Sequence, residues 1–142
     1  MKRSTMVLIV LAVVLVATVL AVSLLYRPKA KNAQSALPNG TPEDIENASR
    51  AGIPYVVKLG SEDCEACVLI DPVLVALADK YRGKVTFIRI DVYEYPKIAA
   101  ENRISVIPTT LFYDAAGNKL GAVQGFMDEA QFEMRMKGYG II

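Results

Sequence analysis

The sequence predicts an α/β domain with a mixed central sheet flanked by helices, preceded by an N-terminal transmembrane helix. Two observations lead to this prediction. Short apolar runs alternate with helical patterns between residues 53 and 102, and two more strands and a helix follow them. Ahead of these elements, the stretch from Met6 to Tyr26 is almost wholly apolar.

The apolar stretch from Met6 to Tyr26 is expected to be an uncleaved signal anchor. Only Thr18 and Ser23 interrupt it. A helix of this length would span about 32 Å, which is enough to cross the hydrocarbon core of a bilayer. The alternatives are a cleaved signal peptide and a buried core helix. The run is long for a signal peptide, however, and no clean small-x-small cleavage site follows it. Residues 1–26 are therefore assigned to the anchor.

Positive residues flank both ends of this segment, so their number alone does not set its orientation. The short basic start at Lys2 and Arg3 favours an inside N-terminus. A disulfide-forming pair also persists more readily outside the cytosol. We therefore expect a single-pass protein of the plasma membrane, with its folded domain on the extracytoplasmic side.

The stretch that follows, residues 27–40 (RPKAKNAQSALPNG), mixes Pro, Gly, Asn and Ser without apolar periodicity, so it is predicted to be a linker. Residues 41–142 then form the folded domain. Charge is divided unevenly along the chain. Residues 1–36 carry five Lys or Arg and no acid, whereas residues 37–142 carry eleven Lys or Arg and fifteen Asp or Glu. The basic end suits anionic lipid headgroups, and the acidic domain argues against binding nucleic acid.

The first helix of the domain is predicted to begin at Pro42, with Thr41 as its N-cap, and to end before Gly52. The elements expected after it are a strand at 53–59, a helix from Cys64 to about Tyr81 with a kink at Pro72, a strand at 85–91 and a short helix at 96–102. The chain then closes with a hairpin whose strands are 109–113 and 119–124, and with a helix over 128–137 that Asp128 caps.

The two cysteines of the chain, Cys64 and Cys67, are three residues apart, and the sequence contains no histidine. The lack of histidine excludes Ser-His and Cys-His catalysis. Zinc needs about four ligands, which this chain lacks unless a dimer supplies them, so no metal is expected. An inert disulfide and a redox pair remain. Because Cys64 opens a helix directly after a strand, the helix dipole favours its thiolate. Cys64 is therefore the expected exposed nucleophile, and Cys67 the resolving thiol.

A second motif, Val106-Ile107-Pro108-Thr109, precedes the hairpin, and Pro72 lies eight residues after the first cysteine. Together with the strand–Cys-x-x-Cys–helix unit, these residues resemble the thioredoxin family over about residues 45–138. The Gly-Ser-x-x-Cys-x-x-Cys run and Gln124-Gly125-Phe126 are similar to membrane-tethered bacterial or archaeal members.

The resemblance implies a thioredoxin fold in which Pro108 is cis and lies against the disulfide. It also implies that the backbone of Ile107 pairs with the substrate chain and that Gly125 lets a partner backbone approach closely. The alternatives are an ordinary strand-entry proline at 108 and a plain turn glycine at 125.

The chain also departs from the family pattern. It contains no tryptophan, and Lys58 stands where members carry a buried acid that assists proton transfer at the resolving thiol. Lys58 is either a buried amine with a lowered pKa that acts in place of this acid, or a side chain that extends its charge to solvent. Asp71 and Asp79 lie on the helix after the cysteines and are expected to be solvated.

The residues around the cysteines are expected to tune their redox potential. Acidic side chains surround Cys64 and disfavour its thiolate, which makes the disulfide harder to reduce and the protein a better reductant. Alternatively these acids are solvated and have a small, screened effect. The expected tuning residues are Glu62, Asp63, Glu65 and Ala66.

We therefore expect a membrane-tethered thiol-disulfide oxidoreductase that reduces protein disulfides and serves cell redox homeostasis. Its redox-active disulfide needs no other cofactor. The expected partners are protein disulfides, membrane lipid through the N-terminal helix and, from the family resemblance, a membrane thiol carrier that supplies electrons. Two alternatives stay open, namely a disulfide oxidase or isomerase and a non-catalytic binding module of thioredoxin fold.

Overall fold

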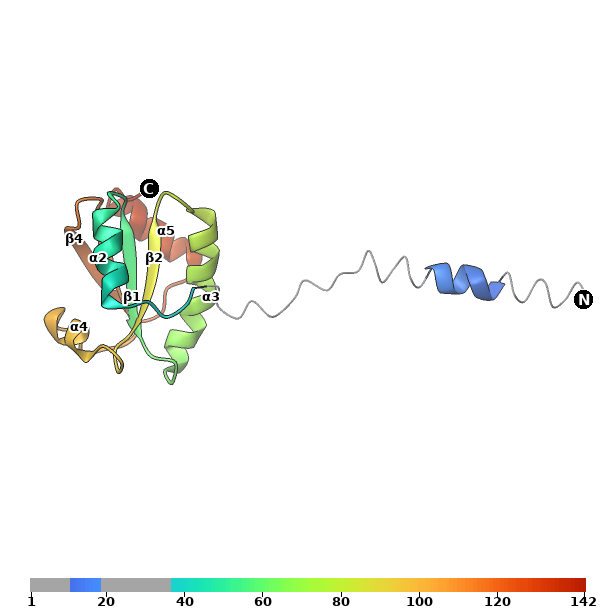
Figure 1. The fold of residues 1–142 in the computed structure, drawn as a ribbon, viewed down its shortest axis with the longest axis horizontal. Coiled ribbons are helices and arrows are strands. Elements are labelled where there is room, and N and C mark those ends of the chain that lie inside the picture. The colour runs from blue at the N-terminus through green and yellow to red at the C-terminus, as the bar shows by residue number, and fades with distance from the viewer. Residues whose placement is uncertain (1–10, 19–36) are drawn as a thin grey trace, which may run out of the picture. The chain divides into compact units, whose positions relative to one another are not determined.

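The structure, a computed structural model, describes residues 11–18 and 37–142 (Figure 1). Residues 11–18 form an exposed helical segment that belongs to a separate unit from the domain. None of the helices in these two described ranges is both long enough and apolar enough to cross a membrane. Most of the predicted anchor from Met6 to Tyr26, and residues 27–36 of the predicted linker, lie outside the described residues, so both assignments stay predictions.

The folded domain follows the element order that the sequence predicts (Figure 1). Its helices and strands are α2 (Pro42–Arg50), β1 (Tyr55–Gly60), α3 (Glu65–Lys80), β2 (Thr86–Asp91), α4 (Pro96–Glu101), β3 (Thr109–Tyr113), β4 (Lys119–Gln124) and α5 (Glu129–Gly138). The hairpin strands coincide with their predicted ranges, and the other elements differ from theirs by one or two residues at an end.

The four strands form one mixed sheet in the order β2-β1-β3-β4. Strand β1 pairs parallel with β2 and antiparallel with β3, and β3 pairs antiparallel with β4. A parallel pair needs a crossover connection, and α3 supplies it between β1 and β2. The prediction of a mixed sheet flanked by helices is therefore confirmed.

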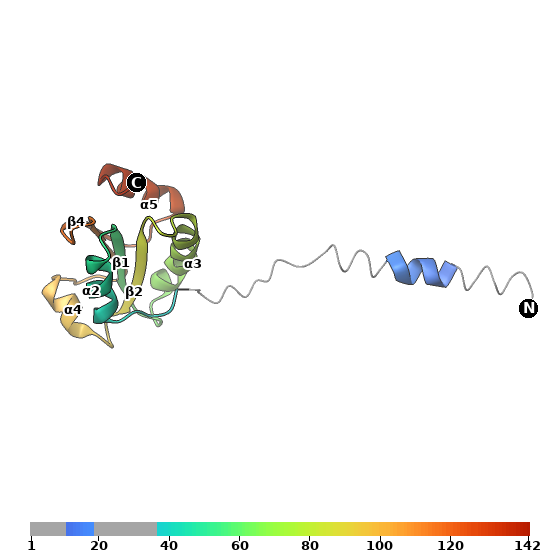
Figure 2. The ribbon, with the colours of Figure 1, turned by 45° about the horizontal axis from the view of Figure 1, so that its top comes forward.

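Apolar residues fill both faces of this sheet. Because side chains alternate along a strand, Val56 of β1 joins the core under α3 and α5, while Val57 joins the core under α2 and α4. Figure 2 shows α2 and α4 on one side of β1 and β2, with α3 on the other. Since β1 is fully buried, the domain holds its cysteine-bearing turn on a central, well-packed strand.

The helix ends have the local causes that the sequence suggests. Thr41 and Asp44 form a capping box at the start of α2, with the Thr41 N–H donating to the Asp44 carboxylate at 2.7 Å. Asp128 caps α5 in the same way. Gly52, just after α2, has a φ of +69°, a conformation that glycine adopts at low cost. Helix α3 continues through Pro72, which lies in its interior.

The end of the predicted linker contacts the domain. Leu37 packs against the core on the α3 side. Asn39 forms a parallel bridge with Arg89 of β2, and the N–H of Gly40 donates to the Arg89 carbonyl at 2.7 Å. Residues 37–40 therefore cover part of the open edge of β2.

Two adjacent threonines of β3 give a matched test of buried polar groups. Thr110 is fully buried, and its hydroxyl has no hydrogen-bond partner among the described residues. Thr109 is equally buried, but its hydroxyl donates to the carbonyl of Val106 at 2.6 Å. A buried hydroxyl without a partner costs free energy, whereas a paired one contributes to stability.

Thr110→Val should therefore raise the free energy of unfolding by about 1 kcal/mol, and Thr109→Val should lower it by about 1 kcal/mol. Urea denaturation of the oxidised protein measures both changes. Equal destabilisation by the two substitutions would contradict this account of Thr110.

Candidate active site

The two cysteines form a disulfide at the point where β1 leads into α3, and their Cα atoms are 5.1 Å apart. Cys64 is the N-cap of α3, and its sulfur accepts a hydrogen bond from the backbone N–H of Cys67, with 3.3 Å between N and Sγ. Cys64 is partly exposed and Cys67 is fully buried. This arrangement agrees with the expected roles of an outer nucleophile and an inner resolving thiol.

A short turn holds Cys64 at the helix start. The hydroxyl of Ser61, which is itself buried, accepts a hydrogen bond from the N–H of Asp63 at 3.1 Å. The N–H of Cys64 donates to the Ser61 carbonyl at 3.4 Å. The backbone N–H of Cys67, in the first turn of α3, lies beside the sulfur of Cys64, where it stabilises negative charge.

The loop before β3 lies against the disulfide, as the family resemblance implies. The Ile107–Pro108 peptide bond is cis, and the carbonyl oxygen of Ile107 is 3.9 Å from the sulfur of Cys64. Gly125 donates its N–H to the Pro108 carbonyl at 2.8 Å and has a φ of +88°. A side chain on Gly125 would meet no atom within 4 Å, so this backbone is open to an approaching chain. The structure thus brings Cys64, Ile107, Pro108 and Gly125 together.

Lys58 is buried and paired. Only 4% of its surface is exposed, so it does not extend its charge to solvent. Its Nζ donates to one carboxylate oxygen of Asp71 at 2.9 Å, and Arg89 donates to the other at 2.7 Å. Burial lowers the pKa of the Lys58 ammonium below its usual value, although the hydrogen bond to Asp71 acts to raise it.

The expectation that Asp71 is solvated was wrong. Its side chain is only 17% exposed and accepts hydrogen bonds from both Lys58 and Arg89. Asp71 faces inward because α3 covers the sheet face that carries these two cations. Asp79, two turns further along α3, is exposed as expected and pairs with Arg82.

The Lys58 amine and the Cys67 sulfur approach each other over Gly60. A Cβ placed on Gly60 would lie 3.0 Å from each of these two atoms, so no more than twice that distance separates them. The lack of a side chain at Gly60 therefore leaves room for both the buried amine and the buried sulfur. A small cavity of about 10 Å³ adjoins the amine, and Gly60, Asp71 and Arg89 are among its lining residues. Its volume is about that of one water site.

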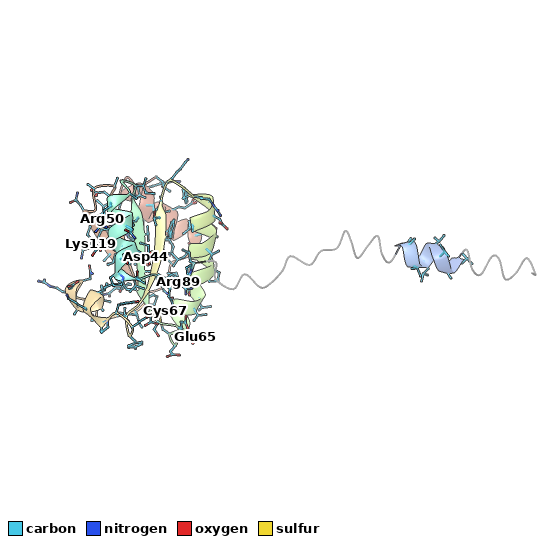
Figure 3. The ribbon with its side chains drawn as sticks, viewed as in Figure 1. Asp44, Arg50, Glu65, Cys67, Arg89 and Lys119 are labelled. Carbon is cyan, nitrogen blue, oxygen red and sulfur yellow. A yellow bond between two sulfur atoms is a disulfide. The ribbon has the colours of Figure 1, made fainter. Side chains whose placement is uncertain are left out.

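The proposed tuning residues lie at the rim of the domain. Glu62, Asp63 and Glu65 are exposed, and Ala66 is half-buried. Figure 3 shows Glu65 at the rim of the domain, beyond Cys67. Solvent screens such charges strongly, so their effect on Cys64 stays a prediction.

Sequence reasoning missed several residues near the disulfide. Arg89 and Asp71 complete the buried charge cluster, and Asn39 links Arg89 to Glu62 through hydrogen bonds of 2.7 and 2.9 Å. The available signal was the charged Arg89 between the apolar residues Ile88 and Ile90 of a strand. Three half-exposed apolar side chains flank the predicted site residues in sequence, namely Val68, Val106 and Phe126.

Within residues 11–18 and 37–142, no cluster of His, Cys, Asp and Glu is placed to hold a metal ion. The Cys64–Cys67 disulfide is thus the reactive group that the described site offers.

Comparison with known proteins agrees with this geometry. The thioredoxin family model matches residues 42–138, about two thirds of the chain. The chain belongs to the thioredoxin family. It is 33% identical to thioredoxin of Staphylococcus aureus over 86 residues, which are 61% of this chain and 81% of that protein. It is 28% identical to thioredoxin of Porphyra purpurea over 87 residues, 61% of this chain and 80% of that protein.

A further relative is the chloroplastic M-type thioredoxin of Spinacia oleracea. It is 36% identical over 74 residues, 50% of this chain but 41% of that protein. Among solved structures, chloroplastic thioredoxin z superposes with a TM-score of 0.66 at 25% identity, covering 73% of this chain and 94% of that one. Thioredoxin NaTrxh from Nicotiana alata superposes with a TM-score of 0.60 at 24% identity, covering 68% and 82%.

Thioredoxins are thiol-disulfide oxidoreductases that use a redox-active disulfide in place of an external cofactor, and they act on protein disulfides. The Cys-x-x-Cys pair of this chain lies between β1 and α3, within the residues that the family model matches. The chain is therefore a thiol-disulfide oxidoreductase. The expected thioredoxin fold of the domain is also confirmed.

The site is expected to need a residue without a side chain at position 60, and a substitution of Gly60 tests this. In Gly60→Ala the new methyl group would lie 2.7 Å from Cε of Lys58, which the Asp71 ion pair holds in place. We expect a loss of about 1–3 kcal/mol in the free energy of unfolding, together with slower disulfide reduction. Urea denaturation and an insulin-reduction assay measure the two effects.

Gly138→Ala is the matched control for this substitution. An added Cβ at Gly138 would meet nothing within 4 Å, and the residue lies at the end of a helix. The free energy of unfolding of the Gly138→Ala protein should equal that of the wild type or exceed it by less than about 1 kcal/mol. A Gly60→Ala protein that matches this control in both assays would show that the contact is unimportant.

Proposed function

We propose that this protein is a membrane-tethered reductase of protein disulfides that works outside the cytosol. The observation that carries the proposal is the partly exposed Cys64 at the start of α3, next to the cis Pro108 loop and with the buried Cys67 behind it. This arrangement supports two successive thiol-disulfide exchanges on one substrate.

The reaction begins from the dithiol form of the protein. The Cys64 thiolate attacks one sulfur of a substrate disulfide, which forms a mixed disulfide and releases the other substrate sulfur as a thiolate. Cys67 then attacks Cys64, which releases the second substrate sulfur and forms the Cys64–Cys67 disulfide. Two electrons pass to the substrate, and each released thiolate takes up a proton.

Substrate chains are proposed to bind beside Pro108. The carbonyl of Ile107 lies next to the Cys64 sulfur, and the positive-φ backbone of Gly125 has open space in front of it. Val106 and Phe126, each about half exposed, flank these backbone groups and offer apolar contact. Such a surface suits an extended segment of an unfolded or flexible protein.

The reducing direction is supported by the charges at the rim. Glu62, Asp63 and Glu65 all lie within two residues of Cys64 in sequence, and their negative charge disfavours a Cys64 thiolate. A less stable thiolate makes the dithiol form a stronger reductant. Ala66, between the cysteines, adds no charge that would oppose this effect.

A disulfide oxidase is the second candidate, and one observation favours it. Lys58 and Arg89 place two cationic side chains behind Cys67 with one carboxylate between them. Positive charge there would favour the thiolate form of the dithiol and hence a more oxidising pair.

The membrane location rests on the apolar stretch from Met6 to Tyr26 and on the basic residues at its ends. The proposed assignment is a signal anchor over residues 1–26, a linker at 27–40 and the thioredoxin-like domain at 41–142, as in tethered bacterial or archaeal members of the family. An extracytoplasmic reductase needs electrons, so a membrane thiol carrier is the proposed donor.

Trapping with Cys67→Ser tests the proposed function. This variant should accumulate mixed disulfides with protein substrates in native membranes, because the second exchange cannot occur. Cys64→Ser should trap nothing, and both variants should lose insulin reduction. Equal weak turnover in the wild type and both variants would instead indicate a binding module whose disulfide is only structural.

The thiol pKa of Cys64 separates reductase from oxidase. We expect a value close to that of an ordinary thiol, about 7 to 8.5, measured from the pH dependence of alkylation. A value below about 5, in the range of strong oxidants, would rule out the reductase.

Membrane attachment is tested by fractionating cells that express the full chain. The full chain should remain with membranes after a carbonate wash, and residues 37–142 alone should be released. Release of the full chain by the wash would contradict the proposed anchor.

A further inference from the structure

We propose that the outer face of α3 rests on the lipid bilayer, so that the domain lies against the membrane with its disulfide near the lipid headgroups. This surface, the outer α3 face, consists of Val68, Leu69, Pro72, Val75 and Ala76. The inference rests on the proposed membrane tether and adds the surface by which the domain meets the membrane.

Helix α3 is apolar on all sides over most of its length. Between Glu65 and Asp79 the sequence contains one charged residue, Asp71, and its side chain is turned inward to Lys58 and Arg89. A helix at the surface of a soluble domain ordinarily carries polar residues on its outer side, and a helix that is apolar all round is ordinarily covered. Figure 1 and Figure 2 both show α3 at the outside of the domain. The outer α3 face is therefore expected to have a partner.

The residues of the outer α3 face form one continuous strip, because residues three and four apart are neighbours on a helix. Val68 and Leu69 are 51% and 60% exposed, and Pro72 and Ala76 are exposed as well. The opposite side of α3 is buried in the core of the domain. The strip is thus apolar surface that the packing of the domain does not use, which is typical of an interaction site.

The chain enters the domain beside this strip. Leu37, where the described part of the domain begins, lines a hollow together with Val75 and Ala78 of α3. Residues 27–36 separate Leu37 from the proposed anchor, and ten residues can span no more than about 35 Å. A tether of this length keeps the strip close to the bilayer, so that even a weak contact can form. A lipid surface is therefore the occupant that the connection of the chain favours.

Charged side chains lie only at the ends of the strip. Glu65 precedes it, and Asp79, which follows it, pairs with Arg82. Insertion of the strip into the interfacial zone of a bilayer would therefore take apolar side chains out of water and leave the charged groups at its ends solvated. Apolar burial carries this contact, and attraction to anionic lipid is not required.

The docked domain keeps its exchange site accessible. Val68 follows Cys67 directly, so the strip begins next to the disulfide. The carbonyl of Ile107 approaches the sulfur of Cys64 from the loop before β3, which is a different element from α3. The site is thereby held at the level of the headgroups, where it meets protein disulfides at the membrane surface.

An introduced tryptophan can report on this contact, because the sequence contains no tryptophan of its own. The full chain with Leu69→Trp is reconstituted into phosphatidylcholine vesicles whose acyl chains are brominated near the headgroup. Bromine quenches tryptophan only at close range, and a docked apolar face lies about 5–10 Å into the interface. We expect the emission of Leu69→Trp to move to shorter wavelength and to lose most of its intensity relative to unbrominated vesicles.

Lys97→Trp is the matched control for the position of the tryptophan. Lys97 is exposed on α4, which lies on the other side of the sheet from α3 (Figure 2). The emission of Lys97→Trp should be the same in brominated and unbrominated vesicles.

A carboxylate within the strip should prevent docking, because the charge would have to leave water. Ala76→Glu, added to Leu69→Trp, should therefore remove most of the quenching. Ala100→Glu, at an exposed alanine of α4, is the matched control and should leave the quenching unchanged.

Salt distinguishes apolar burial from attraction between charges. Raising the NaCl concentration from about 0.1 M to 1 M shortens the Debye length about threefold but does not weaken apolar burial. The quenching of Leu69→Trp should therefore persist at the higher concentration. Its loss there would show that charge holds the domain to the bilayer and would overturn the proposed contact.

Flotation of the vesicles after a carbonate wash separates this proposal from the proposed tether. A full chain that floats while Leu69→Trp and Lys97→Trp respond alike overturns the lipid contact and leaves the tether standing. A full chain that does not float overturns both.

A second copy of the chain is the other occupant that these measurements would reveal. Emission of Leu69→Trp at shorter wavelength with equal intensity in both kinds of vesicle, together with a cross-linked dimer, would assign the outer α3 face to that copy and overturn the lipid contact. Circular dichroism establishes that each variant is folded. If Leu69→Trp does not fold, Ala76→Trp replaces it, with the same quenching expected and the same result overturning the proposal.

Discussion

The structure around the disulfide depends on one buried ion pair, between Lys58 of β1 and Asp71 of α3. An unpaired charge at either position would be very costly in this interior, so the two elements must keep their relative position. Arg89 adds a second cation to the same carboxylate and ties β2 to the arrangement. The helix that carries both cysteines is thereby fixed to the central strand by charge as well as by apolar packing.

This constraint also shapes the chemistry. The buried acid found in the family at the position of Lys58 is replaced by an amine, and the carboxylate comes instead from α3, one turn after Cys67. The buried carboxylate of the site therefore lies on another element and is paired with two cations. The outer surface keeps the cis Pro108 loop and the open backbone of Gly125.

Most of the fold could be predicted from the sequence because its signals are local. The capping box at Thr41, the turn glycine at Gly52 and the hairpin ends all have causes within a few residues. The cysteines and Pro108 were predictable through motif and resemblance. The inward position of Asp71 was not, because the periodicity of α3 does not reveal that two cations lie beneath it. That fact depends on strand register, which pairs Lys58 with Arg89 across β1 and β2.

The contact of Asn39 with Arg89 and Glu62 has a practical consequence for any shortened form of the domain. A chain trimmed to the first helix, beginning at Thr41, would keep every named helix and strand. This shortened chain would nevertheless lack the Asn39 amide, whose oxygen accepts a hydrogen bond from the Arg89 guanidinium. It would also lack Leu37, so the part of the core that Leu37 covers would be exposed. A fragment that preserves the described environment of the disulfide therefore includes Leu37 and Asn39, which lie outside the named helices and strands.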